Sequence, residues 1–481
     1  MTANAKTNTE TNRRRIPSLL IAGLLFTTLA TEWFLNGEAA RDTAPPGWKY
    51  AATTGPVSLR VRADRTAVLA GEDGRVRMEL ILEAEKRAFR DMSVPTDLLV
   101  VLDTSGSMQG DKIEHGIAAI EALIDQLGDG DRFALVTYSY DAQLTVPLAP
   151  ASWVAKQRSK HVLREIVADG GTNISRGLDV AYETLESARD EARASRVILI
   201  SDGLANHGDS TEQGLTLRAA RFTERERVLS AVGVGADFNE YVMSRLADAG
   251  TGNYYYLESS SGLAQIFAKE FSATRDTVAR GVAVAFELGR GVDVVDVAGY
   301  PLERNDGRVT FRPGSMFAGQ KRRVWVTYEV PTKSAGDYEL GSVTASYNAD
   351  GMAHRTTVHD TATIACVENE SSYFAGIDKE AWEQSVVEEA YGELRASVAH
   401  DVKEGRRDEA KAKLEAYRTR QQWMNQGIGS ALVEKNIGEV AELEAEMDLA
   451  FQGDDQADKR NQFSKSTQSR AIEVRRSGSK K

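Results

Sequence analysis

The chain has 481 residues, 42% hydrophobic and 27% charged, which is the composition of a folded globular protein whose length suits two to four domains. Its net charge of -12 argues against nucleic acid as the main partner, because binding to phosphates requires a basic surface. A single cysteine, Cys366, excludes an internal disulfide and a cysteine-based zinc site, and the six histidines form no zinc-binding motif.

The N-terminal segment predicts a membrane anchor or an export signal. A basic segment at residues 1–15, expected to be cytoplasmic, precedes an apolar stretch at residues 16–35 in which Glu32 is the only charge. Such a stretch is either a signal peptide or one transmembrane helix, and the lack of a clean cleavage site favours the helix. We therefore expect a single-pass cell-membrane protein with its bulk outside the cytoplasm, periplasmic or extracellular, or a secreted protein if residues 16–39 are cleaved.

Strand periodicity begins after a linker at residues 36–56, which is rich in proline, glycine and small residues. Residues 57–92 alternate apolar and polar side chains around a turn, which predicts a hairpin. Two strands are too few to be stable alone, and residues 279–367 return to the same period of two. We expect these two segments to form one β-sandwich, with the intervening domain inserted in it or flanked by it.

The intervening residues, 97–272, predict an α/β domain. Short apolar strands such as DLLVVLD and RVILIS alternate with segments of helical periodicity. This alternation is typical of a doubly wound, mostly parallel sheet with helices on both faces. Ligands bind to such sheets at the carboxyl ends of the strands, where the sequence places DTSGSM at residues 103–108 and SDG at residues 201–203.

The C-terminal part of the chain predicts helices and then a tail. Apolar stripes with helical spacing mark a charged helical region at residues 378–452, whose helices we expect to pack on each other or on the sandwich. Residues 453–481 are basic and poor in apolar side chains. We therefore expect a disordered basic tail.

DTSGSM could belong to a nucleophile, a phosphate cradle or a metal site. A serine nucleophile needs a base and a strained elbow, and neither accompanies Ser105 or Ser107; His207 is the only histidine placed to come near. A phosphate cradle requires glycines and a lysine at fixed spacing, which DTSGSMQGDK does not have. The acid at the head of the loop would also repel phosphate.

A hard divalent cation accounts for these residues best. Mg²⁺ prefers oxygen ligands and keeps waters where a protein offers few carboxylates, and Mn²⁺ accepts the same oxygen set. Asp103 supplies charge, and Ser105 and Ser107 supply hydroxyls two residues apart. Further oxygens can come from Thr172, which follows a glycine pair, and from Asp202 of SDG. These five residues are the predicted metal ligands, and with only two acids the ion can take an outside carboxylate.

These motifs resemble those of the von Willebrand factor type A family, in that family's order. D-x-S-x-S follows a buried strand, a threonine follows in a G-T-N loop, and an aspartate lies in S-D-G. The likeness covers roughly residues 97–272. It implies a metal-ion-dependent adhesion site in which Ser105 and Ser107 bind the ion directly, and Thr172, Asp103 and Asp202 bind it directly or through water. The wider layout loosely resembles bacterial relatives of inter-alpha-trypsin inhibitor heavy chains.

The resemblance implies binding rather than catalysis. We expect an extracytoplasmic adhesion or scaffold module, not an enzyme, whose Mg²⁺ or Mn²⁺ takes an Asp or Glu carboxylate from a protein partner. The loops at Asp141, 169–173 and 206–211 would set specificity, and the last helix, at residues 262–271, would shift if the domain switches as family members do. Two alternatives stay open: an accessory subunit of a membrane complex or an ATPase, and a metal-assisted hydrolase, for which no general base is evident.

Overall fold

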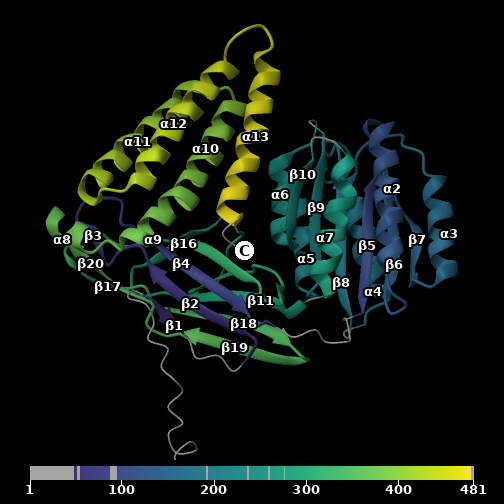
Figure 1. The fold of residues 1–481 in the computed structure, drawn as a ribbon, viewed down its shortest axis with the longest axis horizontal. Helices are drawn as coiled ribbons and strands as arrows, with labels where there is room; N and C mark the ends of the chain where they lie inside the picture. The colour runs from purple at the N-terminus through teal and green to yellow at the C-terminus, as the bar shows by residue number, and fades with distance from the viewer. Residues whose placement is uncertain are drawn as a thin grey trace, which may run out of the picture. The chain divides into compact units, whose positions relative to one another are not determined.

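The computed structural model describes residues 48–50, 55–86, 95–190, 193–235, 238–257, 260–275, 277–298 and 300–477. These residues lie in one compact unit that runs from residue 47 to residue 481. Within it the chain forms an α/β domain, a β-rich region and a helical region (Figure 1). The basic segment at residues 1–15 and the apolar segment at residues 16–35 lie outside the described residues.

The expected localisation as a single-pass membrane protein is corrected. None of the helices in the described residues combines the length and the apolar composition that a membrane span requires. A transmembrane helix needs about 20 predominantly apolar residues. The helices of that length, α11 (Arg407–Ile428), α12 (Ala431–Ala450) and α13 (Gln456–Ser477), are instead rich in charged side chains.

The α/β domain is built on a six-stranded sheet with the order β10-β9-β8-β5-β6-β7. All neighbours are parallel except β6 and β7, which are antiparallel. The central strands are buried on both faces, which explains their continuous apolar runs. The strands are β5 (Thr96–Asp103), β6 (Arg132–Tyr138), β7 (Ala142–Pro150), β8 (Ala194–Ser201), β9 (Val228–Val234) and β10 (Thr251–Leu257). This mixed, mostly parallel sheet confirms the α/β prediction.

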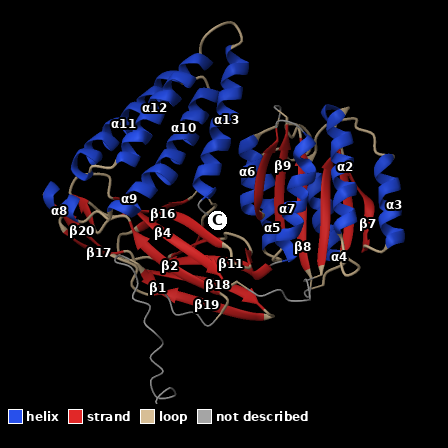
Figure 2. Ribbon diagram, in the orientation of Figure 1, coloured by secondary structure: helices blue, strands red, loops and turns tan. Residues whose placement is uncertain are grey.

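Helices cover both faces of this sheet (Figure 2). Successive residues of β5 point to opposite faces: Leu98, Val100 and Leu102 join the core under α2 and α7, whereas Leu99 and Val101 join the core under α4, α5 and α6. The helices are α2 (Asp111–Gln126), α3 (Trp153–Arg164), α4 (Ile174–Ser187), α5 (Glu212–Thr223), α6 (Glu240–Ala249) and α7 (Leu263–Arg275), with short 3₁₀ turns η1 (Gly106–Met108) and η2 (Ser260–Gly262).

The β-rich region pairs strands from before and after the α/β domain. One sheet has the order β1-β2-β4-β16-β12, in which Leu80 of β4 pairs with Val324 of β16. A second sheet, β13-β14-β11-β18-β19, shares one hydrophobic core with the first. A third, small sheet has the order β17-β20-β3. The expected further β-structure is thus present, and the α/β domain interrupts the first sheet along the sequence.

The strands of this region come from two stretches of the chain. Before the α/β domain lie β1 (Lys49–Tyr50), β2 (Val57–Ala63), β3 (Ala67–Leu69) and β4 (Arg75–Ala84). After it lie β11 (Thr277–Glu287), β12 (Asp293–Val297), β13 (Glu303–Asn305), β14 (Arg308–Phe311), β15 (Met316–Phe317), β16 (Lys321–Glu329), β17 (Gly336–Glu339), β18 (Ser342–Ala349), β19 (Met352–Val358) and β20 (Thr363–Val367).

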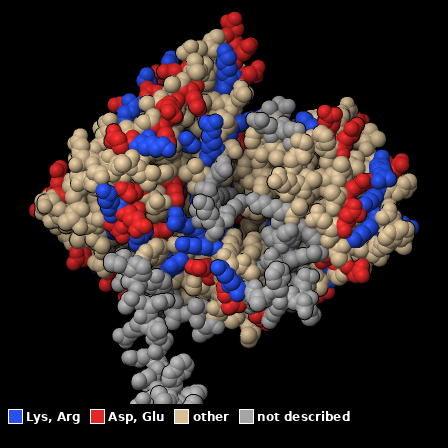
Figure 3. All heavy atoms as spheres, in the orientation of Figure 1, with Lys and Arg blue, Asp and Glu red and all other residues tan. Residues whose placement is uncertain are grey.

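The C-terminal region is helical, as expected, and it extends further than expected. Its elements before α11 are α8 (Glu370–Ala375), α9 (Lys379–Gln384), the π-helical turn η3 (Ser385–Ala390) and α10 (Tyr391–Lys403). The prediction of a disordered tail at residues 453–481 is wrong over most of its length, because α13 packs against α10 and α12. Besides Phe463, the buried side chains of α13 are small: Ser464, Thr467 and Ala471. Serine and threonine lower the mean hydropathy of the segment, so the sequence did not indicate that one face of this helix is buried. On the face seen in Figure 3, acidic and basic side chains are interspersed over these helices.

Candidate metal centre

The five predicted ligands come from three loops at the carboxyl end of the sheet. Asp103 is the last residue of β5, and Ser105 and Ser107 lie in the turn that contains η1. Asp202 directly follows β8, the parallel neighbour of β5, and Thr172 lies two residues before α4. Because parallel neighbours end at the same edge, the two aspartates are brought together.

Asp103 is a fully buried carboxylate that is held from three sides. The backbone N–H of Ser105 donates to Oδ1 at 2.8 Å, and the hydroxyls of Ser201 and Tyr138 donate to Oδ2 at 2.7 Å and 3.3 Å. Burial raises the pKa of Asp103 to about 6, although the hydrogen bonds from Ser105 and Ser201 act in the opposite direction. The negative charge of Asp202 raises the pKa further. A nearby cation would relieve both unfavourable effects.

The serine hydroxyls connect the two aspartates. Ser105 Oγ lies 3.1 Å from Ser107 Oγ, and Ser107 Oγ donates to Asp202 Oδ1 at 2.7 Å. Asp202 is fully buried, whereas Ser107 is exposed. Four of the five predicted ligands therefore form one hydrogen-bonded chain that reaches the surface at Ser107.

Thr172 approaches the same space from the loop at residues 169–173. A Cβ added to Gly203 would lie 3.4 Å from both Ser107 Oγ and Thr172 Oγ1, so the two hydroxyls face one small space. The loop is anchored by the N–H of Gly106, which donates to the carbonyl of Gly170 at 3.0 Å, and by Asn206 Oδ1, which accepts from the N–H of Thr172 at 2.8 Å. The structure thus brings all five residues together.

The donor set fits a hard divalent cation. It contains only oxygen atoms, from two carboxylates and three hydroxyls, and glycine at position 203 has no Cβ, which would contact the hydroxyls of Ser107 and Thr172. Mg²⁺ and Mn²⁺ prefer such oxygen ligands, whereas soft metals prefer thiolates and imidazoles.

Sequence reasoning missed the residues that support the ligands. Lys112, in the first turn of α2, forms an ion pair with Asp202 at 2.5 Å between Nζ and Oδ2. Tyr138 and Ser201, on β6 and β8, hold Asp103, and Asn206 holds the Thr172 loop. The lysine of DTSGSMQGDK was a usable signal, because it lies at the start of the helix that follows the serine turn. Tyr138 and Ser201 depend on the pairing of their strands with β5, and Asn206 depends on the contact between its loop and the Thr172 loop. The sequence alone specifies neither.

Three side chains, here called the rim, lie on or against the loops that carry Thr172 and Asp202: Tyr140 packs beside Gly170, His207 packs over Gly171, and Leu204 follows Asp202 by two residues. The ring centroids of Tyr140 and His207 lie 4.7 Å apart at a near-perpendicular angle, and the side chains of Tyr140 and Leu204 are 61% and 55% exposed. Within the described residues the imidazole of His207 makes no hydrogen bond to a ligand hydroxyl. It lies over Gly171 instead, where an added Cβ would come within 2.2 Å of its ring.

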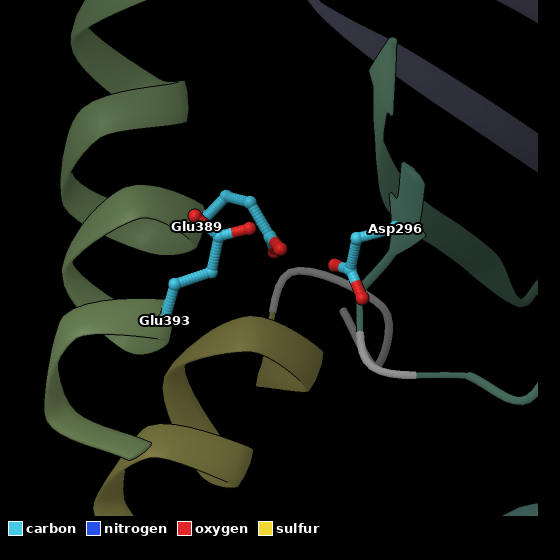
Figure 4. Close-up of side chains that lie close together, drawn as sticks. All are labelled: Asp296, Glu389 and Glu393. Atoms are coloured by element: carbon cyan, nitrogen blue, oxygen red, sulfur yellow. The ribbon is translucent and has the colours of Figure 1, made fainter. Parts of the chain in front are cut away.

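A second carboxylate cluster lies outside the α/β domain. The side chains of Asp296, Glu389 and Glu393 point toward one another, with oxygens within 4.8 Å (Figure 4). Burial raises the pKa of Glu389 to about 8, which the guanidinium of Arg475 opposes. Arg475 contacts both Asp296 and Glu389 and so already supplies a cation. We therefore interpret this cluster as a structural ion network that attaches α13.

Comparison with known proteins identifies the α/β domain. Residues 97–269 match the family model of the von Willebrand factor type A domain. The uncharacterized protein YfbK of Escherichia coli is 30% identical over 195 residues, or 40% of this chain and 34% of that protein. Inter-alpha-trypsin inhibitor heavy chain H4 of Bos taurus is 28% identical over 179 residues, or 36% of this chain and 20% of that protein. The chain thus spans about a third of the length of YfbK and about a fifth of the length of heavy chain H4.

A solved structure shows the same fold over most of the chain. A von Willebrand factor type A protein from Catenulispora acidiphila superposes with a TM-score of 0.60 at 17% identity, and the match covers 91% of this chain and 98% of that one. The resemblances noted in the sequence, to the type A family and to inter-alpha-trypsin inhibitor heavy chains, are therefore confirmed.

Proposed function

Since the chain contains a von Willebrand factor type A domain, a kind of domain that typically mediates protein–protein interaction, we propose that it is a metal-dependent protein-binding module. A divalent cation, Mg²⁺ or Mn²⁺, would be held by the five oxygen-bearing side chains of the candidate centre. A partner protein's Asp or Glu would complete its coordination. The observation that carries this proposal is the convergence of all five donors at one sheet edge: Asp103, Ser105, Ser107, Thr172 and Asp202.

The charge and exposure of the donors support an outside ligand. Two carboxylates offset the charge of a divalent cation but leave several coordination positions to neutral or external oxygens. Asp103 and Asp202 are buried beneath the site, whereas Ser107 is exposed. An approaching carboxylate would therefore meet the cation from the side of Ser107, away from the two buried acids. When bound, the cation supplies an electrophilic contact for that carboxylate.

The rim of Tyr140, Leu204 and His207 would supply the rest of the contact. Exposed aromatic side chains bury large area at low entropic cost, and they are frequent among the residues that dominate binding energy. The loops that we expect to set specificity carry two of these side chains, since Tyr140 precedes Asp141 and His207 lies within 206–211.

The same geometry favours binding over hydrolysis. A general base must lie within hydrogen-bond reach of the proton that it removes. His207, the candidate base, packs edge-on against Tyr140 and over Gly171. We therefore propose a non-enzymatic role for this centre.

A peptide display experiment tests the proposal. The full chain would be screened against random peptides that each carry one Asp or Glu, in Mg²⁺ and in EDTA. We expect binding that EDTA abolishes, that Asp103→Ala abolishes, and that fails when the peptide's Asp or Glu is replaced by Asn or Gln. Peptide binding that survives EDTA and the variant would overturn the proposal.

A further inference from the structure

Lys112 occupies the oxygen of Asp202 that the serine network leaves free. Its Nζ lies 2.5 Å from Asp202 Oδ2, while Ser107 Oγ donates to Oδ1 of the same carboxylate at 2.7 Å. Asp202 is fully buried, and the lysine side chain is 28% exposed. The chain itself therefore supplies donors to both oxygens of a proposed metal ligand.

The contact between Lys112 and Asp202 places a positive charge beside the buried negative charges of the centre. Asp103 and Asp202 are both fully buried, so two carboxylates lie side by side out of contact with water. Buried carboxylates without a compensating cation destabilise a folded protein. Among the residues that the structure describes, Lys112 is the one cationic side chain in an ion pair with either aspartate.

We propose that Lys112 is a tethered counter-ion that stabilises the metal-free centre and weakens its affinity for the divalent cation. The inference rests on the proposed metal site and concerns how tightly that site holds its ion. An ammonium on a flexible four-carbon stem, partly open to solvent, can neutralise Asp202 when no metal is bound and shift aside, to about 5 Å from the ion, when one is. Its charge repels a divalent cation at the neighbouring position.

Weaker intrinsic metal binding has a functional consequence. A partner carboxylate adds a negative charge beside the cation, which offsets the repulsion from Lys112. Binding of the metal and of the partner are then coupled, and by linkage each raises the affinity of the other by the same factor. Because Lys112 weakens the binding of the cation alone, the centre would hold its cation more tightly when a partner carboxylate is bound.

Charge-removing and charge-keeping variants test this role in the full-length protein. Lys112→Gln removes the charge and Lys112→Arg keeps it. Lys160→Gln is the matched control, because Lys160 pairs at 2.6 Å with Asp125, a largely exposed acid on the same domain. Thermal unfolding in EDTA reports on the metal-free protein, and calorimetry with Mg²⁺ alone reports on affinity.

Lys112→Gln should unfold at a lower temperature than the wild type in EDTA. It should also bind Mg²⁺ about tenfold more tightly or better. Even in water, a unit positive charge about 5 Å from a divalent cation lowers the binding constant of that cation more than tenfold. Lys112→Arg and Lys160→Gln should match the wild type. If the wild type binds Mg²⁺ and Lys112→Gln binds it no more tightly, the role of Lys112 is rejected while the metal site stands. If neither binds Mg²⁺, the metal site is rejected, and this role with it.

Discussion

Ser107 Oγ donates a 2.7 Å hydrogen bond to Asp202 Oδ1, and this contact joins the turn after β5 to the loop after β8. The two residues are 95 positions apart in the chain. Through this bond an exposed hydroxyl is held against a buried carboxylate at the edge of the sheet. The candidate centre depends on this convergence of two loops that are far apart in the sequence.

Removing a hydroxyl ligand should weaken metal binding without unfolding the domain. Ser107→Ala and Thr172→Ala each delete one neutral oxygen donor, and we expect each to lower Mg²⁺ affinity by about tenfold, as for the loss of one hydrogen bond to a charged group. Isothermal calorimetry measures the change. Ser152→Ala is the control, because Ser152 caps α3 and should affect stability by about 1 kcal/mol but not affinity. Equal losses in all three variants would contradict a specific role for Ser107 and Thr172.

Filling the space at Gly203 should have a similar effect by a steric route. The methyl group of Gly203→Ala would contact Ser107 Oγ and Thr172 Oγ1, each at 3.4 Å, and so crowd two of the proposed ligands. We expect Mg²⁺ affinity to fall while circular dichroism stays unchanged. Gly438→Ala, where nothing lies within 4 Å of the added Cβ, should leave affinity unchanged and stabilise α12 by up to about 1 kcal/mol. Metal binding by Gly203→Ala at the wild-type level would mean that the ion lies elsewhere.

The rim should affect partner binding and not metal binding. Tyr140 is 61% exposed, so Tyr140→Ala should fold normally and bind Mg²⁺ as the wild type does. Its affinity for a selected Asp- or Glu-containing peptide should fall by about tenfold or more, as for a central aromatic contact. Trp153→Ala removes another aromatic side chain of the same domain, 74% exposed, and serves as the control. If the two variants lose peptide affinity equally, the rim has no special role.

The last helix of the domain is attached by a buried polar network. Glu270 of α7 pairs with Arg196 of β8 and accepts hydrogen bonds from the side chains of Ser230, Asn253 and Tyr255 at 2.6–2.7 Å. Although burial alone would raise the pKa of Glu270, Arg196 and these donors lower it below its usual range. Any conformational switch that moves α7 must break this network. The network therefore stabilises α7 in the position seen here.

Glu270→Gln should therefore destabilise the domain by about 3 kcal/mol near neutral pH, because it leaves Arg196 buried without its partner. Since the folded-state pKa of Glu270 is lowered, its carboxylate contributes stability above the ordinary glutamate pKa, and this contribution is lost as the pH falls through the folded-state value. The difference between wild type and variant should narrow below about pH 4. Urea unfolding across pH measures it, with Glu121→Gln, which breaks an exposed pair with Arg164, as the control. A difference that grows toward low pH would contradict this assignment.

The sequence predicts those features of the fold and the centre that short stretches of neighbouring residues determine, and not those that depend on contacts between distant residues. Asp103 ends one apolar strand and Asp202 directly follows another, so their place at the sheet edge could be predicted from short motifs. Lys112 was missed because its partner is 90 positions away, and α13 was missed because its buried stripe is built mostly of small polar residues and alanine around Phe463. β4 and β16 pair although the whole α/β domain lies between them in the sequence. Only the instability expected of two strands alone suggested this pairing.

The most direct test of the central claim is calorimetric titration of the full-length protein with Mg²⁺ and Mn²⁺, wild type beside Asp103→Ala. Circular dichroism and thermal unfolding would confirm that the variant stays folded. We predict one ion bound per wild-type chain and no binding by the folded variant. Absence of binding by the wild type, or equal binding by both proteins, would contradict the assignment of these five residues as a metal centre.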